Sequence, residues 1–147
     1  MLGGICVRQL FSGFRVGISR TLSMATEKLN SIPAIEIDPE GTFKYILIKV
    51  YGPDTPKGSE PYKMIVRGFK WAAYHGNIYD ATKAKLEQLG LDSECVGGGR
   101  IQHDPVNKSI KVYGHSTGFG KADHEVTVGI LKNVYQGYNI TWSDEGY

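Results

Sequence analysis

Residues 43–51 (FKYILIKVY) constrain the fold of this chain more than any other segment. β-branched and aromatic side chains dominate the run, and both of its alternating faces are largely apolar. A strand with this pattern is covered on both faces, which predicts a central position in a sheet. The chain has 147 residues, enough for one domain with a hydrophobic core built around this strand.

The other expected elements interleave irregularly along the chain. Periodicity predicts further strands and two helices, with the strands at residues 63–69, 94–102, 109–113 and 138–142 and the helices at residues 76–89 and 122–135. Residues 52–61 are rich in proline and glycine and are expected to form a connector. These elements predict an α+β fold, a single compact domain whose mixed β-sheet is flanked by two α-helices.

Residues 1–30 are expected to form an N-terminal extension, and residues 31–147 the domain. Apolar side chains recur at helical spacing in the extension, which has three arginines and no acidic residue before Met24. Two interpretations stay open. Residues 1–23 form a mitochondrial transit peptide, or they are a disordered tail or sequence upstream of a second start at Met24. We therefore expect a cytoplasmic protein, or a mitochondrial one if the first interpretation holds.

Charge and cysteine content exclude several classes of protein. The chain has 17 basic and 15 acidic residues, but without residues 1–23 the basic count falls to 14 and the net charge from +2 to −1. A folded domain that binds nucleic acid normally has a basic surplus, so no nucleic-acid partner is expected. No segment approaches the roughly 20 apolar residues that span a membrane. Two cysteines make no disulfide framework or zinc pattern and suit a reducing compartment.

His75 is the first candidate for chemistry, because it follows a predicted strand and directly precedes a predicted helix. The free N–H groups at a helix start attract anions and disfavour a protonated imidazole. A neutral imidazole can accept a proton from water or attack phosphorus itself. The alternative is a partly buried structural histidine.

Lys44 is the second candidate. It shares a strand face with Ile46, Ile48 and Val50, so it is a cation at the end of an apolar row. Lysine is rarely buried without a partner, and a bound phosphate would be such a partner. The alternative is a surface lysine whose ammonium group reaches water.

Residues 94–101 (ECVGGGRI) contain three consecutive glycines followed by Arg100. Glycines next to an arginine suit a phosphate pocket, because the backbone amides can approach an anion closely. The same glycines also suit a bulge in a strand. Both interpretations stay open.

Residues 113–120 (YGHSTGFG) follow a predicted strand, and their small side chains allow several amides to surround one anion. The hydroxyl groups of Ser116 and Thr117 are expected to join these amides. The segment also matches the G-x-S-x-G pattern of serine hydrolases. We reject that match because the chain is too short for the fold and Gly118 delays any helix to about Ala122.

The three other histidines, His103, His115 and His124, are spaced 12 and 9 residues apart. This spacing does not fit a metal site, so no metal and no other cofactor is expected.

Four blocks in fixed order resemble the phosphohistidine phosphatase family, which includes the insect Janus and ocnus proteins. They are VRGFKWAAYHGNIYD (66–80), ECVGGGRI (94–101), VYGHSTGFG (112–120) and TWSDEGY (141–147). The resemblance implies a metal-independent, monomeric phosphatase that acts on histidine-phosphorylated proteins and, in some members, on phospholysine. Insect Janus relatives are also linked to somatic sex differentiation.

The resemblance also implies roles for individual residues. The catalytic histidine of the family matches His75, and the other matched positions are Lys44 for substrate contact, Ser116, Thr117 and Gly118 for the phosphate loop, and Arg67 and Arg100 near the pocket. His115 stands where an aromatic residue is expected. Under this hypothesis His75 is a general base, or it forms a covalent phosphohistidine intermediate. The alternative is a non-catalytic module that binds phosphorylated proteins.

Overall fold

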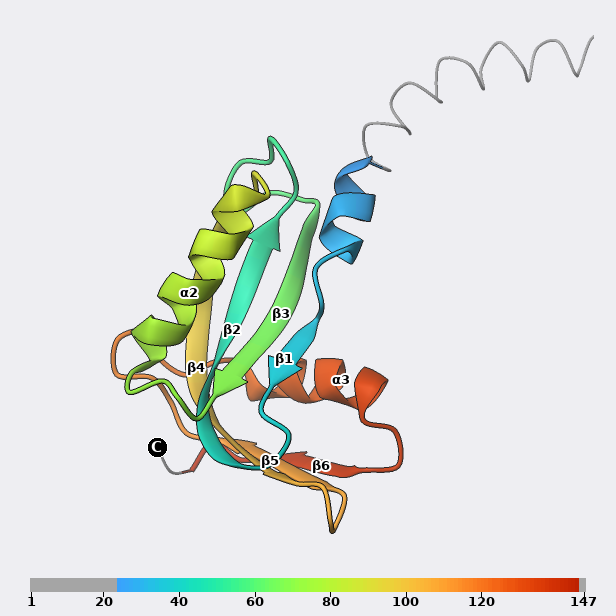
Figure 1. Cartoon of the computed structure of the whole chain (residues 1–147), viewed down its shortest axis with the longest axis vertical. Coiled ribbons are helices and arrows are strands. Elements are labelled where there is room, and N and C mark those ends of the chain that lie inside the picture. The colour runs from blue at the N-terminus through green and yellow to red at the C-terminus, as the bar shows by residue number, and fades with distance from the viewer. Residues whose placement is uncertain (1–23, 146–147) are drawn as a thin grey trace, which may run out of the picture.

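Six strands form one mixed sheet in the computed structural model, which describes residues 24–145 (Figure 1). They are β1 (Ile35–Ile37), β2 (Gly41–Tyr51), β3 (Tyr62–Phe69), β4 (Ser93–Asp104), β5 (Ser109–Tyr113) and β6 (Asn139–Trp142). Their order in the sheet is β1-β3-β2-β4-β5-β6. The inner pairs are antiparallel, whereas each edge strand runs parallel to its neighbour. The predicted α+β fold with a mixed sheet is confirmed.

β2 lies at the centre of the sheet because both of its faces are apolar. Phe43, Tyr45 and Leu47 belong to one core cluster, and the alternate residues of β2 belong to a second cluster on the other face. Successive side chains of a strand point to opposite faces, so one strand contributes to two cores. Full burial of an apolar side chain stabilises the fold by about 1.5–3 kcal/mol, which secures the central position.

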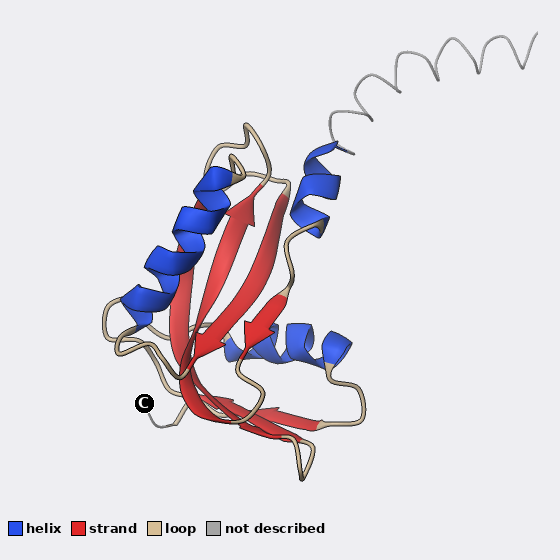
Figure 2. Cartoon of the chain, in the orientation of Figure 1, coloured by secondary structure: helices blue, strands red, loops and turns tan. Residues whose placement is uncertain are grey.

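One helix covers each face of the sheet (Figures 1 and 2). α2 (His75–Gln88) buries Ile78 and Leu86 in the cluster that contains Ile46, whereas α3 (His124–Val134) buries Val128 and Leu131 against the opposite face. Both helices were predicted to within two residues at each end. Gly90 follows the end of α2, as is common at helix ends. Asp123, which the predicted helix included, instead precedes α3, and its carboxylate accepts hydrogen bonds from two backbone amides.

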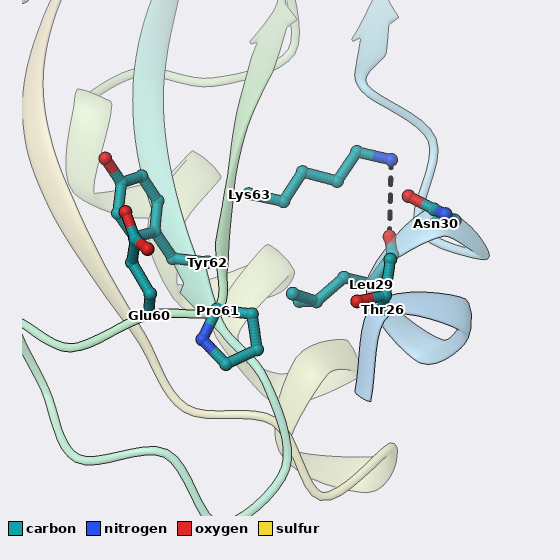
Figure 3. A pocket seen from close by; sticks show the side chains of 7 residues that line it. All are labelled: Thr26, Leu29, Asn30, Glu60, Pro61, Tyr62 and Lys63. Atoms are coloured by element: carbon teal, nitrogen blue, oxygen red, sulfur yellow. Dashed lines mark hydrogen bonds between the residues drawn. The ribbon is translucent and has the colours of Figure 1, made fainter. Parts of the chain in front are cut away.

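The sequence did not predict β1 or the helix over residues 24–30. Leu29 of that helix is buried in the core on the α2 side, so packing begins before residue 31, the expected start of the domain. The ammonium group of Lys63 on β3 donates hydrogen bonds to the carbonyl oxygens of Leu29 and Ile32, the first of which Figure 3 shows. The predicted transit peptide or tail over residues 1–23 lies outside the described residues.

β4 carries a bulge at Val96. Leu47 of β2 pairs with Gly97, whereas the next residue, Ile48, pairs with Cys95. One extra residue therefore lies in β4, which bends a strand and increases its twist. The interpretation of the glycine run as part of a strand bulge is confirmed.

Candidate active site

A cavity of about 400 Å³ lies where the start of α2, Lys44 of β2, Arg100 of β4 and the segment after β5 come together. Its walls contain six of the seven residues predicted from the sequence: Lys44, His75, Arg100, Ser116, Thr117 and Gly118. The other lining residues are Tyr74, Gly76, His115 and Phe119. No acidic residue is among these ten. Segments far apart in the sequence thus form one basic cavity.

His75 is the first residue of α2, and the residue before it has an extended backbone. The side-chain oxygen of Asn77 accepts a hydrogen bond from the amide of Tyr74 at 2.8 Å, which closes the first turn of the helix. The helix therefore begins one residue before the predicted start. This start holds the half-buried imidazole of His75 against β4.

The hydrogen bond of His75 identifies its basic nitrogen. Nε2 lies 2.9 Å from the carbonyl oxygen of Gly99. A carbonyl oxygen only accepts hydrogen bonds, so Nε2 carries the proton and the lone pair of the neutral ring is on Nδ1. Burial lowers the pKa of His75; the hydrogen bond to Gly99 opposes this, and the positive charges of Lys44 and Arg100 lower it further. The imidazole is therefore neutral near pH 7, with Nδ1 as a base.

Two cations face each other beside this ring. Lys44 of β2 and Arg100 of β4 are direct partners in the antiparallel register, so their side chains leave the same face of the sheet. Like charges placed directly opposite each other in a strand pair are destabilising. Both side chains line the cavity. The cavity therefore presents two cations to any anion that enters it.

The residues after β5 form a tight turn over residues 116–120. The amide of Ser116 donates to the carbonyl of Gly120 at 3.0 Å, the amide of Gly120 donates back at 2.8 Å, and the hydroxyl oxygen of Ser116 accepts from the amide of Phe119. Of the amides in the predicted phosphate loop over residues 116–118, that of Ser116 is therefore used within the turn. Within the described chain, the amides of Thr117 and Gly118 have no protein acceptor. They are the turn amides available to an anion.

Gly98 explains why a glycine run belongs here. A Cβ atom at this position would lie 2.8 Å from Cδ2 of His75 and 3.0 Å from Cβ of Ser116, closer than side chains normally approach. The amide of Gly98 donates to Gly120, and its carbonyl accepts from Ala122. The glycine thus lets the start of α2 and the turn meet over β4. Its own amide is not free for a ligand.

His124 supports the turn from the other face of the sheet, and sequence reasoning missed this role. Its ring is buried, and Nε2 donates to the carbonyl oxygen of Gly114 at 2.8 Å. Nδ1 therefore accepts from the hydroxyl of Tyr45 at 2.5 Å, and that hydroxyl also lies 3.1 Å from the hydroxyl of Thr127. Gly114 stands two residues before Ser116. The only sequence signal was a histidine directly after a helix-capping aspartate, which does not reveal the distant partner.

Arg67 is not part of the cavity, which corrects its predicted position near the pocket. It is 4% exposed on β3 and donates hydrogen bonds to the carbonyl oxygens of Pro33, at 2.8 Å, and Val66. Its Nε also lies 3.5 Å from a carboxylate oxygen of Glu36 on β1. β1, which the sequence did not predict, supplies this ion pair and so gives Arg67 a structural role at the edge of the sheet.

Neither a cluster of metal-binding side chains nor a membrane-spanning helix occurs among the residues that the structure describes. No group of three or more histidine, cysteine, aspartate or glutamate residues there is arranged to hold a metal ion. No helix over the same residues is long and apolar enough to cross a bilayer.

Known proteins resemble this chain over most of its length. The profile of the Janus/Ocnus family (Ocnus) matches residues 29–139. The chain belongs to the Janus/Ocnus family. It is 48% identical over 136 residues to the sex-regulated protein janus-A of Drosophila pseudoobscura pseudoobscura, an alignment that covers 92% of this chain and 91% of the relative.

Two mammalian relatives are named for an enzymatic activity. The chain is 46% identical over 126 residues to the 14 kDa phosphohistidine phosphatase of Sus scrofa, covering 84% of this chain and 98% of the relative. It is 43% identical over 127 residues to the human protein of that name, covering 84% of this chain and all of the relative. The predicted family is confirmed.

Proposed function

We propose that this Janus/Ocnus protein is a metal-independent phosphatase that hydrolyses phosphohistidine in proteins, with His75 as general base. The proposal rests on one observation above all: a neutral imidazole lies beside two directly opposed cations in a cavity without an acidic residue. The names of the mammalian relatives support the same substrate class. A phosphoryl group is an anion that the two cations can bind and that lies within reach of a base, the imidazole of His75.

The phosphoryl oxygens are held by charge and by amides. Lys44 and Arg100 bind them from the sheet, and the amides of Thr117 and Gly118 bind them from the turn. The hydroxyl of Ser116 retains its proton for a further hydrogen bond, because its oxygen is the acceptor for Phe119. These donors stand in place before the substrate arrives, which favours the transition state, where charge is spread over the phosphoryl oxygens.

His75 activates the water. Nδ1 takes a proton as the water oxygen attacks phosphorus, and the imidazolium that results is stabilised by the Nε2 hydrogen bond to Gly99. The P–N bond breaks in line with the attack. In the alternative route Nδ1 attacks phosphorus itself and water cleaves the phosphorylated ring. Rapid-quench labelling under single turnover distinguishes the routes, since only the second gives a phosphorylated protein.

One chain supplies all ten residues of the cavity, so a monomer suffices for this chemistry. The partner is a histidine-phosphorylated protein, and phospholysine is a second substrate that the same anion site accepts. No step requires a metal. Activity is therefore expected to persist in excess EDTA.

The deciding experiment is hydrolysis of a phosphohistidine peptide in EDTA by the wild type and by His75→Ala. We expect turnover by the wild type and a fall of about 10²–10⁴ in the variant, the usual contribution of a general base. Unchanged turnover in the variant contradicts the proposal. Tight binding of the peptide by the wild type without turnover favours the alternative of a non-catalytic phosphoprotein-binding module.

A further inference from the structure

We propose that His115 is the general acid that protonates the leaving group. The inference rests on the proposed function and adds to it a catalytic residue. His115 lines the same cavity as His75 and is exposed, whereas His75 is half-buried and bonded to the sheet. The two imidazoles therefore lie at different depths of one cavity, with the base inside and the second ring towards solvent.

The chemistry of phosphohistidine requires such a group. When the P–N bond breaks, its electron pair stays on the substrate ring, and an imidazolide anion is a poor leaving group. A proton added to the other ring nitrogen lets the ring leave as neutral imidazole. General acids contribute about 10²–10⁴ to reactions of this kind. The donor must lie where the substrate ring lies, outside the phosphoryl site.

The position of His115 meets this requirement. It directly precedes Ser116, whose turn holds the phosphoryl oxygens, and it follows β5. A ring attached to a protein must extend from the phosphoryl group towards the open side of the cavity. His115 and Tyr74 are the exposed titratable residues among those that line it. Both imidazoles line this one cavity.

An imidazolium suits the task better than the phenol of Tyr74. Ordinary histidine titrates near pH 6.5, whereas ordinary tyrosine holds its proton until about pH 10, so it is a much weaker acid. The charged groups that share the cavity are Lys44 on β2, Arg100 on β4 and His75 on α2. A phosphoryl group bound among these cations brings negative charge, and a charged donor forms a stronger hydrogen bond than a neutral one.

The step balances without any further reactant. The water oxygen forms a bond to phosphorus while the P–N bond breaks, and Nδ1 of His75 receives the proton of the water. His115 gives its proton to the free nitrogen of the leaving ring. After the products depart, His75 loses a proton to solvent and His115 gains one. The net reaction consumes one water molecule.

A substrate whose leaving group needs no proton tests the assignment. The two substrates are a phosphohistidine peptide and 1-phosphoryl-3-methylimidazolium, in which a methyl group occupies the nitrogen that would be protonated. The enzymes are the wild type, His115→Phe and His115→Gln. We expect both variants to lose about 10²–10⁴ in kcat on the peptide and less than about tenfold on the methylated compound. The descending limb of the kcat–pH profile at high pH is expected to disappear in both variants.

The outcomes separate this inference from the proposed function. Equal losses on both substrates, or no loss on either, overturn the role of His115 while hydrolysis by the wild type upholds the function. A selective loss on the peptide in Tyr74→Phe, with none in His115→Phe, overturns it in favour of Tyr74. Absence of hydrolysis of both substrates by the wild type overturns the proposed function itself, and the inference with it.

Discussion

The N-termini of α2 and α3 use the same residue for two different purposes. Each helix begins with a histidine, and each ring donates a hydrogen bond from Nε2 to a backbone carbonyl, that of Gly99 for His75 and that of Gly114 for His124. Burial is the main factor that lowers the pKa of both. The difference lies at Nδ1. In His124, Nδ1 accepts a hydrogen bond from the hydroxyl of Tyr45. The ring of His75 instead lines an open cavity.

This comparison shows that local sequence does not distinguish the proposed catalytic histidine, His75, from the structural one, His124. Both rings are neutral near pH 7 and both are in the same tautomer. Only a base with an accessible lone pair can take a proton from water. The surroundings of Nδ1 therefore determine the role, and the predictions below test this distinction from the largest expected effect to the smallest.

His75→Ala tests the catalytic side of the comparison. Activity on phosphohistidine is expected to fall by about 10²–10⁴ because the base is lost. Thermal unfolding should change little, since the ring is half-buried and makes one hydrogen bond. An unfolding temperature far below that of the wild type would show that His75, like His124, is structural.

Lys44→Met tests whether the opposed cations bind the phosphoryl group. Loss of one such donor is expected to lower the rate by about 10²–10³. The matched control is Lys111→Met, which removes an exposed lysine of β5 that does not line the cavity. Inorganic phosphate should raise the unfolding temperature of the wild type and of Lys111→Met. The rise should be smaller in Lys44→Met. Equal effects of both substitutions would indicate a general charge effect.

His124→Phe tests the structural side. The carbonyl of Gly114 loses its buried partner, while the hydroxyl of Tyr45 keeps only that of Thr127, and an unsatisfied buried group costs about 1–3 kcal/mol. Urea denaturation should show this loss of stability. The double variant with Tyr45→Phe should be less than additive, because the two side chains share one hydrogen bond. Strict additivity would contradict the network.

A change of pH sharpens the comparison further. Because both folded-state pKa values lie below the ordinary value near 6.5, the unfolded chain binds protons first as the pH falls. Stability is therefore fully present above about pH 6.5 and declines as the pH falls towards the folded-state values. Between pH 7.5 and 5, the unfolding temperature of His124→Phe should fall less than that of the wild type. The kcat/KM profile should lose activity on its acid side only below pH 6.5, through His75 alone.

Much of the fold was predictable because it depends on local patterns. The two apolar faces of β2 identified the central strand, and helical periodicity located α2 and α3 to within two residues at each end. β1 was not predictable, because three residues carry no periodicity and their strand conformation depends on pairing with β3. The position of Arg67 followed from that same missing strand, whose Glu36 pairs with it.

The residues of the candidate site were predictable from the sequence, but their roles were predictable only in part. Family resemblance and residue type singled out six residues that share the cavity. The Ser116 amide could not be assigned, because its acceptor belongs to the same turn and depends on the turn's geometry. His124 was missed because its partners lie on β2 and just after β5.

The sequence by itself determined the long strands and the two helices that cover the sheet, the near-neutral charge of the body and the residue types available for phosphoryl chemistry. These depend on periodicity, capping and composition, which act within a few residues. Only the tertiary structure decided which nitrogen of His75 is basic and that Lys44 lies opposite Arg100. The physical reason is that proton position and charge repulsion depend on atoms a few ångströms apart in space, and these atoms come from residues far apart in the chain.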